Sequence, residues 1–287
     1  MNNFIAGYLP LFDIYLIHLG LAFSQYIVLR AGVFSLATAA FAGIGAYTAG
    51  IFAVSLGLHP AIGLLAGTLT GMGAAIVLSI PLARLQGVYQ AIATVAFIQI
   101  CLSLNIYAEG LTGGAMGLNN IPKTIGTGTL FVFAALATYL IWAIERGRLG
   151  RAFNTIRQDE AVAASLGISI TRHQMLAFAI SGALAGLFGG LEASHSYALD
   201  PNQFGFHLLI TTLSYVIWGG RNSVVGPLVG AAILIILPEL ARPLAENRMV
   251  IYGIMLIVVI NYLPKGIADT AIDAVRARRL KNGGDGS

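Results

Sequence analysis

The chain has 287 residues, of which 57% are hydrophobic and only 10% are charged, and its formal net charge is +4. Soluble domains carry about 25% charged residues, so these few charges could not cover the surface of a water-soluble globule. The composition excludes an ordinary soluble enzyme or binding domain and indicates a protein that lies in a lipid bilayer. It indicates no nucleic-acid partner either, because the basic residues cluster at the ends of apolar runs and in the C-terminal tail, where membrane topology places them.

Nine apolar runs are predicted to form membrane-spanning helices, since a hydrocarbon core needs about 20 apolar residues per helix. Several runs are short or rich in glycine, which predicts that some are broken or re-entrant. The expected fold class is therefore all-α, a polytopic transmembrane helix bundle of about 8–10 spans. The runs are 9–29, 33–56, 61–83, 88–108, 130–144, 173–193, 206–218, 224–240 and 249–263.

The placement of lysine and arginine predicts the orientation of these spans. If the polar segment 145–172 lies in the cytoplasm, only Lys123, Arg242 and Arg248 of the 16 basic residues fall outside, whereas the inverted topology reverses that ratio. The N-terminus is therefore expected to be periplasmic and the C-terminus cytoplasmic. Residues 1–265 form the expected transmembrane domain, and 266–287 form a basic cytoplasmic tail.

Glycines recur four residues apart in two of the predicted spans. This spacing is about one helical turn, so each set forms a flat stripe at which two backbones can approach closely. The stripes predict ordinary helix packing, with an interface that moves between two states as the alternative. They consist of Gly63, Gly67 and Gly71, and of Gly182, Gly186 and Gly190.

The segment 145–172 does not belong in lipid, because it is rich in charge. Its middle is predicted to form a short helix over residues 158–166. Asp159 and Glu160 lie in the first turn, where the helix dipole favours anions, and Gly167 is suited to ending the helix.

The next predicted span opens with Thr171 and Gln174, which have the spacing of a capping box. The preceding short helix is rich in alanine, and its small side chains, such as those of Ala161 and Ala164, would fit a groove on a partner. The spacing alone leaves two interpretations open, a connecting loop and a docking element.

The run 159–168 resembles the EAA-type coupling segment of ABC importer permeases, and more narrowly that of the branched-chain amino acid permease family, the LivM/LivH type. The similarity covers most of residues 30–265. Other matching stretches are 39–49, 111–118, 150–157, 176–182 and 219–231.

The resemblance implies a permease of the bacterial inner membrane that pairs with a second, homologous permease chain. It also implies ATP-binding cassette subunits on the cytoplasmic face and a periplasmic solute-binding protein. This chain would bind no cofactor, since ATP and magnesium would act on the partner subunits. The residues expected to couple to the ATPase are Arg157, Asp159, Glu160, Ala161, Ala164 and Gly167.

The sequence departs from the family pattern at several positions. It has Ser-Leu-Ala-Thr-Ala at 35–39 where Ser-Leu-Gly-His-Ala is common, Asn222 in place of a glycine, and Gln86 and Gln99 in place of an arginine and an acidic residue. Branched-chain or related small amino acids are the expected solutes, and urea, short amides or simple sugars are the alternatives.

Polar residues inside membrane spans are costly and face a bundle interior or a cavity. Asp13, His18, Gln25, Asn105 and Glu192 meet this description, with interhelical hydrogen bonding as the alternative role. The candidates for the solute pathway are Thr38, Tyr89, Gln90, Thr94, Gln99, Thr112, Gly113 and Gly114. His195 and His207 are too loosely spaced for a metal site, and none is expected.

Two function classes other than an ABC permease are also considered. An ATP-independent secondary transporter would work with this chain alone, and it gives no reason for the short polar helix. An intramembrane enzyme would need a convergent set of catalytic groups, whereas the histidines and carboxylates here are scattered and form no HExxH or GxSxG motif.

Overall fold

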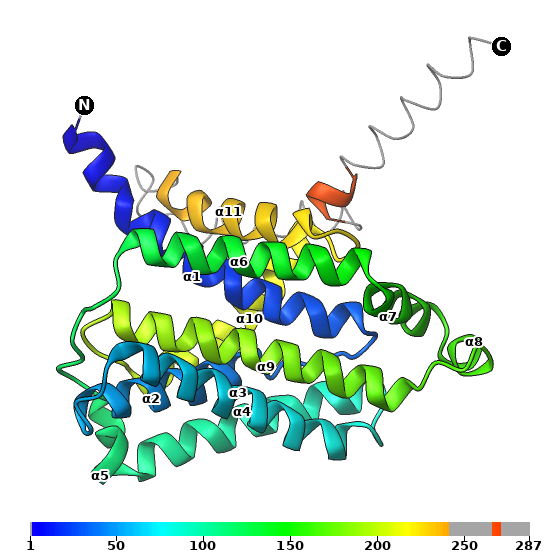
Figure 1. Ribbon diagram of the computed structural model, residues 1–287, viewed down its shortest axis with the longest axis horizontal. Coiled ribbons are helices and arrows are strands. Elements are labelled where there is room, and N and C mark those ends of the chain that lie inside the picture. Colours follow the sequence, from blue (N-terminus) through cyan, green and yellow to red (C-terminus); the bar gives the residue numbers. More distant parts are fainter. Residues whose placement is uncertain (1, 241–265, 271–287) are drawn as a thin grey trace. The chain divides into compact units, whose positions relative to one another are not determined.

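The computed structural model of the chain describes residues 2–240 and 266–270, and within them helices joined by short connections form the structure (Figure 1). The long helices are α1 (Asn2–Arg30), α2 (Thr38–Val54), α3 (Pro60–Leu82), α4 (Val88–Tyr107), α6 (Thr127–Arg146), α9 (Ile170–His195), α10 (Phe206–Gly219) and α11 (Val225–Leu240). Shorter elements are α5 (Glu109–Thr112), α7 (Arg148–Gln158), α8 (Glu160–Ser165), and the 3₁₀ turns η1 (Gly114–Met116) and η2 (Pro201–Phe204).

The first eight predicted runs all fall on helices, which confirms the all-α membrane bundle. Among the described residues, five helices are long and apolar enough to cross a bilayer, namely Leu9–Arg30, Pro60–Leu82, Val88–Tyr107, Thr127–Arg146 and Ile170–His195. Thr38–Val54 and Val225–Leu237 are shorter apolar helices. The ninth predicted run, 249–263, and residues 271–287 of the predicted tail lie outside the described residues.

The second predicted run begins later than expected. Residues 33–37 are not helical, because the chain turns at Gly32, whose φ of +83° lies in the left-handed region that favours glycine. The helix then starts at Thr38.

The chain divides into two compact units, Met1–Leu213 and Ser214–Ser287. This division falls at a different place from the predicted boundary at residue 265, which concerned membrane and tail rather than compactness and stays a prediction.

The core of the first unit is built on glycines of α2, α3 and α9. A Cβ atom on Gly45 of α2 would lie 2.3 Å from the carbonyl oxygen of Gly186, and one on Gly186 would lie 2.4 Å from that of Gly67. On Gly71 it would lie 2.6 Å from the carbonyl oxygen of Gly182. The predicted stripes on α3 and α9 therefore face each other, which confirms close helix packing.

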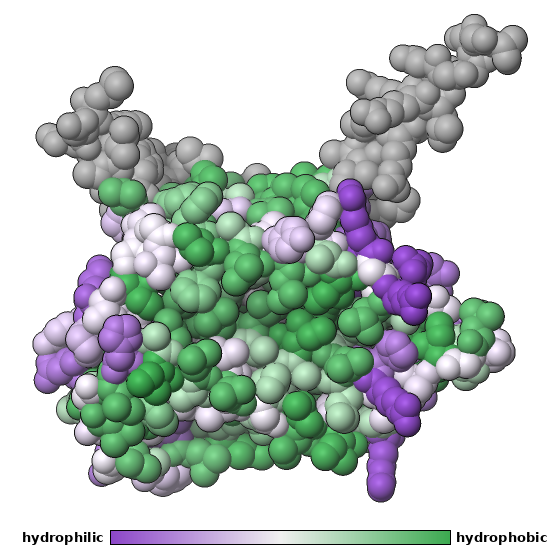
Figure 2. Space-filling view, viewed as in Figure 1, coloured by the Kyte–Doolittle hydropathy of each residue, from purple (hydrophilic) through white to green (hydrophobic). Residues whose placement is uncertain are grey.

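The outer face of α6 is suited to lipid. Its exposed side chains are large and apolar, and they include Phe131, Val132 and Leu136. Toward the C-terminal end of the helix come Trp142 and Arg146, whose guanidinium lies 4.1 Å from the centre of the Trp142 ring. Aromatic and basic side chains are typical of the membrane interface, so this end of α6 marks the edge of the bilayer. Figure 2 shows apolar side chains over the middle of the face and hydrophilic ones gathered near α7 and α8.

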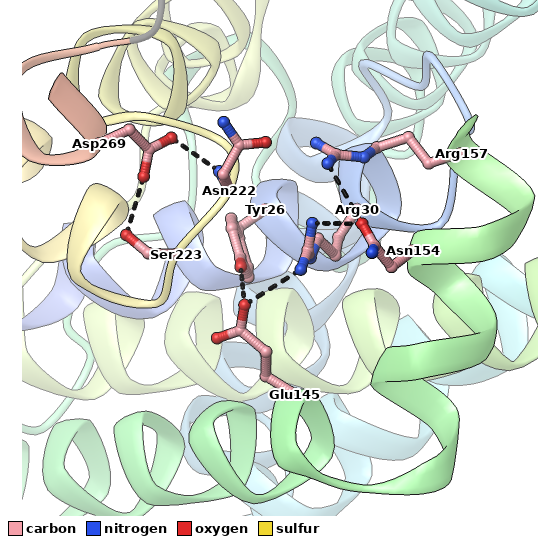
Figure 3. Close-up of polar contacts among 8 residues, drawn as sticks. All are labelled: Tyr26, Arg30, Glu145, Asn154, Arg157, Asn222, Ser223 and Asp269. Atoms are coloured by element: carbon pink, nitrogen blue, oxygen red, sulfur yellow. Dashed lines mark hydrogen bonds and ion pairs between the residues drawn. The ribbon is translucent and has the colours of Figure 1, made fainter. Parts of the chain in front are cut away.

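In the second unit, one carboxylate binds the loop between α10 and α11. Asp269 accepts hydrogen bonds from the backbone N–H of Asn222 and the hydroxyl of Ser223, each at 2.9 Å (Figure 3). Gly220 packs against the same carboxylate with φ +114°, so a side chain there would collide with it. Asp269 thereby fixes the loop between α10 and α11.

Candidate functional site

The polar segment after α6 forms two helices rather than one. α7 runs from Arg148 to Gln158, and α8 from Glu160 to Ser165, with extended backbone at Asp159 between them. The prediction of a single short helix over 158–166 located α8 and missed α7. Its start was also wrong, because Gln158 ends α7 and Asp159 is the N-cap of α8 rather than part of its first turn. The signal for α7 is the spacing of Leu149, Phe153 and Ile156, since apolar residues at i, i+4 and i+7 share one helix face. Phe153 and Ile156 are buried.

Both ends of α8 are capped. The carboxylate oxygen Oδ1 of Asp159 accepts from the backbone N–H groups of Ala161 and Val162 at 2.8 and 3.1 Å, as an N-cap residue does. At the other end, the N–H groups of Gly167 and Ile168 donate to the carbonyl oxygens of Ala164 and Ala163, both at 3.0 Å.

Those two bonds form a Schellman motif, in which the residue after the helix takes a left-handed conformation. Gly167 has φ +77°, as the motif requires. The predicted role of Gly167 in ending the helix is confirmed.

The predicted cap of the following span is wrong. α9 begins at Ile170 with Ser169 at its N-cap, so Thr171 already lies inside the helix. Gln174 points back to α8 instead, where its side-chain amide donates to Glu160 at 3.5 Å. A helix start is hard to place from sequence because several residues near it have capping side chains.

The residues expected to couple to an ATPase divide into three groups. Ala161, Ala164 and Gly167 are exposed at the tip of the segment, as are Val162 and Leu166, which the sequence analysis did not select. Asp159 and Glu160 shape α8 from its start, as described above. Arg157 is half-buried and donates to Asn154 at 3.3 Å within α7. The tip is thus small and apolar, and the charges flank it (Figures 1 and 2).

Three of the pathway candidates hold the link between α1 and α2. The side chain of Gln90 accepts from the N–H of Phe34 at 3.3 Å, and the Thr94 hydroxyl accepts from that of Leu36 at 3.1 Å. The Thr38 hydroxyl donates to the side chain of Gln25 at 2.8 Å. All three candidates are buried, and their hydrogen-bond partners named here are groups of the protein. Their role in the pathway stays a prediction.

The other two candidates on α4 are exposed. Tyr89 is 72% exposed, and Gln99 also lies on the surface of the helix. Ser103, one turn after Gln99, is exposed on the same face. Two exposed polar side chains one turn apart on a spanning helix do not suit a lipid environment.

The glycine-rich loop after α4, residues 111–122, is hydrogen-bonded through its backbone to the segment that follows α9. Leu118 and Leu199 exchange backbone hydrogen bonds at 3.1 and 2.9 Å. Within the loop, the buried Thr112 hydroxyl donates to the carbonyl oxygens of Asn105 and Ala108. Figure 1 shows α5, at the start of this loop, and α8 at opposite ends of the first unit.

Gly113 and Gly114 turn the chain within that loop with φ of +75° and +60°. A Cβ on Gly113 would lie 2.1 Å from the carbonyl oxygen of Gly117. Both glycines are therefore required by the backbone path, whatever their relation to a solute.

Buried carboxylates lie in the same half of the unit as this loop. Asp13 of α1 pairs with His195 at 3.5 Å, and Glu192 accepts a hydrogen bond from the Gln203 side chain. These contacts tie α1, α9 and η2 together. Within residues 2–240 and 266–270, no group of three or more His, Cys, Asp or Glu is arranged to hold a metal ion.

Comparison with known proteins identifies the family of the chain. Residues 5–260 match the family described as branched-chain amino acid transport system / permease component. The high-affinity branched-chain amino acid transport system permease protein LivM of Salmonella typhimurium is 30% identical over 88% of this chain and 67% of its own length.

Two further relatives match about half of the chain. The permease protein LivH of the same kind of transport system in Escherichia coli is 29% identical over 48% of this chain and 45% of its own length. The autoinducer 2 import system permease protein LsrC of an Enterobacter species is 33% identical over 44% and 37%. No solved structure matches the chain. Because the family match and the similarity to LivM extend over most of its length, the chain belongs to the branched-chain amino acid permease family.

Proposed function

We propose that this chain imports branched-chain amino acids, or closely similar small amino acids, as the permease subunit of an ABC transporter whose ATPase contacts α8. As a member of its family, the chain is a multi-pass permease component of the inner membrane and not an enzyme. The observation that carries the proposal is α8 itself, a six-residue helix capped at both ends whose small side chains are exposed.

The construction of α8 supports a docking role over a simple connection. A helix this short is unstable alone, so its caps are needed to keep it formed. A solvated loop requires no such structure. The exposed Val162 and Leu166 add apolar surface that a partner's groove would bury, and Glu160 with Gln174 joins the helix to the start of α9.

The orientation follows from the same segment. By the positive-inside rule, the arginines around α7 and α8 support a cytoplasmic location for this end of the first unit and a periplasmic location for the loop 111–122. Arg30 and Glu145, which the predicted topology puts on one side of the membrane, form an ion pair, and this supports the topology. The N-terminus would be periplasmic and the C-terminus cytoplasmic.

The exposed Gln99 and Ser103 of α4 support a second permease chain as a partner. Gln99 lies about 16 Å along α4 from Val88, close to the middle of a hydrocarbon core of about 30 Å. An amide at that depth requires polar surroundings, and a homologous chain across the solute pathway would provide them. A pair formed by this chain and a LivH-like chain is the simplest arrangement.

The remaining partners would contact the chain on the two sides of the membrane. A solute-binding protein would dock at the periplasmic loop that contains Gly113 and Gly114. ATP and magnesium would be held by the ATPase subunits, and this chain would bind no cofactor. Urea, short amides and simple sugars stay as alternative solutes.

The test is uptake by the complex purified through a tag on this chain and reconstituted in lipid vesicles with its binding protein. Labelled leucine should enter only when ATP is present, and unlabelled leucine, isoleucine and valine should compete far better than urea, acetamide or ribose. A complex that retains no ATPase, or leucine uptake that is independent of ATP, would refute the importer. Stronger competition by urea or ribose would refute the solute class alone.

A further inference from the structure

A cluster of polar side chains joins α7 to the two spanning helices α1 and α6. It consists of Tyr26 and Arg30 of α1, Glu145 of α6, and Asn154 and Arg157 of α7, and it is called the arginine cluster below (Figure 3). Arg30 is at its centre. One guanidinium nitrogen of Arg30 lies 3.3 Å from a carboxylate oxygen of Glu145, and another donates to the side-chain oxygen of Asn154 at 3.1 Å.

The outer members of the arginine cluster bind the same two acceptors. The buried Tyr26 hydroxyl donates to Glu145 at 3.2 Å, and Arg157 donates to Asn154 at 3.3 Å. The side chains of Arg30 and Glu145 are only 12% and 24% exposed, so their attraction is screened less than that of a surface pair. The planar fork of the guanidinium allows one side chain to bind α6 and α7 at the same time.

The backbone contact beside the arginine cluster is equally close. Gly32, in the turn that follows α1, has φ +83°, and a Cβ there would lie 3.2 Å from the Cα of Arg157. The turn therefore packs directly on the backbone at the end of α7. Phe153 of α7 is buried, and its ring meets that of His173 of α9 edge to face at 6.3 Å. α7 therefore contacts α9 as well as the turn that follows α1.

We propose that the arginine cluster transmits movement of α8 to α1 and α6, with Arg30 as the positioning residue that holds α7 to both helices. This inference rests on the proposed coupling to an ATPase. α8 has two connections to the bundle, a short one to α9 and another through α7. The arginine cluster makes the second connection stiff, so a push on α8 moves α1 and α6 as well as α9. Without it, α7 would be held less firmly, and less of the movement would reach α1 and α6.

The experiment compares transport with ATP hydrolysis in the complete reconstituted transporter, using labelled leucine as the probe. Arg30→Met removes every donor of the arginine cluster's central side chain and keeps its approximate length. The variant should hydrolyse ATP at a rate near that of the wild type, while the amount of leucine imported per ATP falls about fivefold or more. A role in stability alone would lower the amount of active transporter and leave this ratio unchanged.

Two further variants and a control sharpen the result. Arg30→Lys keeps the charge but loses the fork, and its ratio should lie between those of Arg30→Met and the wild type. The exchange of Arg30→Glu with Glu145→Arg should restore the ratio, because the Asn154 amide has donors as well as an acceptor and can bind either charge. Arg84→Gln removes an exposed basic residue beyond the end of α3 and should leave the ratio unchanged.

The failure of this inference differs from the failure of the proposed function. If the wild-type complex imports no leucine with ATP, the proposed function is refuted. If the wild type imports leucine and Arg30→Met keeps the same ratio, the arginine cluster is only a structural tie and the inference is refuted. Should Arg30→Met fail to assemble, the ratio of Arg30→Lys decides, and a value equal to that of the wild type overturns the inference.

Discussion

Replacing Gly167 with valine isolates the contribution of the α8 C-cap to transport. The residue has φ +77°, and its N–H donates to the carbonyl oxygen of Ala164 at 3.0 Å. No atom beyond its chain neighbours lies within 4 Å of the position of a Cβ. A side chain at this position therefore causes no collision, and any effect comes from the backbone conformation.

The expected magnitude follows from the cost of that conformation. An L-residue in the left-handed region costs about 1–2 kcal/mol, and a β-branched residue such as valine is expected at the upper end. About 2 kcal/mol changes the population of the capped conformation by roughly thirtyfold. A six-residue helix has little stability of its own to offset this change, so most molecules of Gly167→Val should lose the C-terminal half of α8.

The control is Gly167→Asn, because asparagine tolerates the left-handed conformation. Both variants are reconstituted with the ATPase, and ATP hydrolysis and leucine uptake are measured together with the melting temperature of the purified complex. Gly167→Val should lose most uptake per ATP with an unchanged melting temperature, and Gly167→Asn should resemble the wild type. Equal uptake by the two variants would refute the role assigned to the cap.

Three further substitutions test other parts of the structure. Asp159→Ala removes an N-cap worth about 1 kcal/mol and should lower uptake about fivefold, whereas Asp159→Asn, which still caps, should not; equal activities would contradict this. Gly186→Val places atoms against the Gly67 carbonyl and should prevent recovery of monodisperse protein by size-exclusion chromatography, while Gly73→Ala, whose Cβ meets nothing within 4 Å, should be recovered like the wild type. Gln99→Leu should reduce leucine uptake about fivefold by removing a polar contact across the pathway, and Ile100→Leu on the same helix should have no effect; full uptake by Gln99→Leu would place α4 against lipid.

The sequence predicted the spans and their packing because these depend on local patterns. A run of about 20 apolar residues has few stable alternatives to a membrane helix. Glycines at four-residue spacing must lie on one face of that helix, and for Gly67 and Gly186 this face is where α3 meets α9. The C-terminal end of α8 was also predictable, since Gly167 is the residue type that its cap requires, whereas Asp159 was expected in the first turn and is the N-cap.

The polar contacts could not be predicted in the same way, because they join distant parts of the chain. Arg30 and Glu145 are separated by 115 positions, and nothing local to either residue names the other. Gln90 and Thr94 were selected as pathway residues because polar groups inside a span are expected to face a cavity or the bundle interior. The structure shows both accepting hydrogen bonds from the backbone N–H groups of Phe34 and Leu36, which no local pattern indicated.

The packing of α9 explains how a contact at α8 could act at the far end of the first unit. α9 begins next to α8 and ends beside the loop 111–122, which is hydrogen-bonded to the segment after α9. Along its length, Gly182 and Gly186 bring its backbone against α3, and Gly189 brings it against the carbonyl oxygen of Ala42 in α2. Backbones in direct contact have no flexible side chains between them that could absorb a displacement, and close-packed interiors transmit strain. We therefore expect α2, α3 and α9 to move as one body when α8 is displaced, so that the loop 111–122 responds to an event at the opposite end of the first unit.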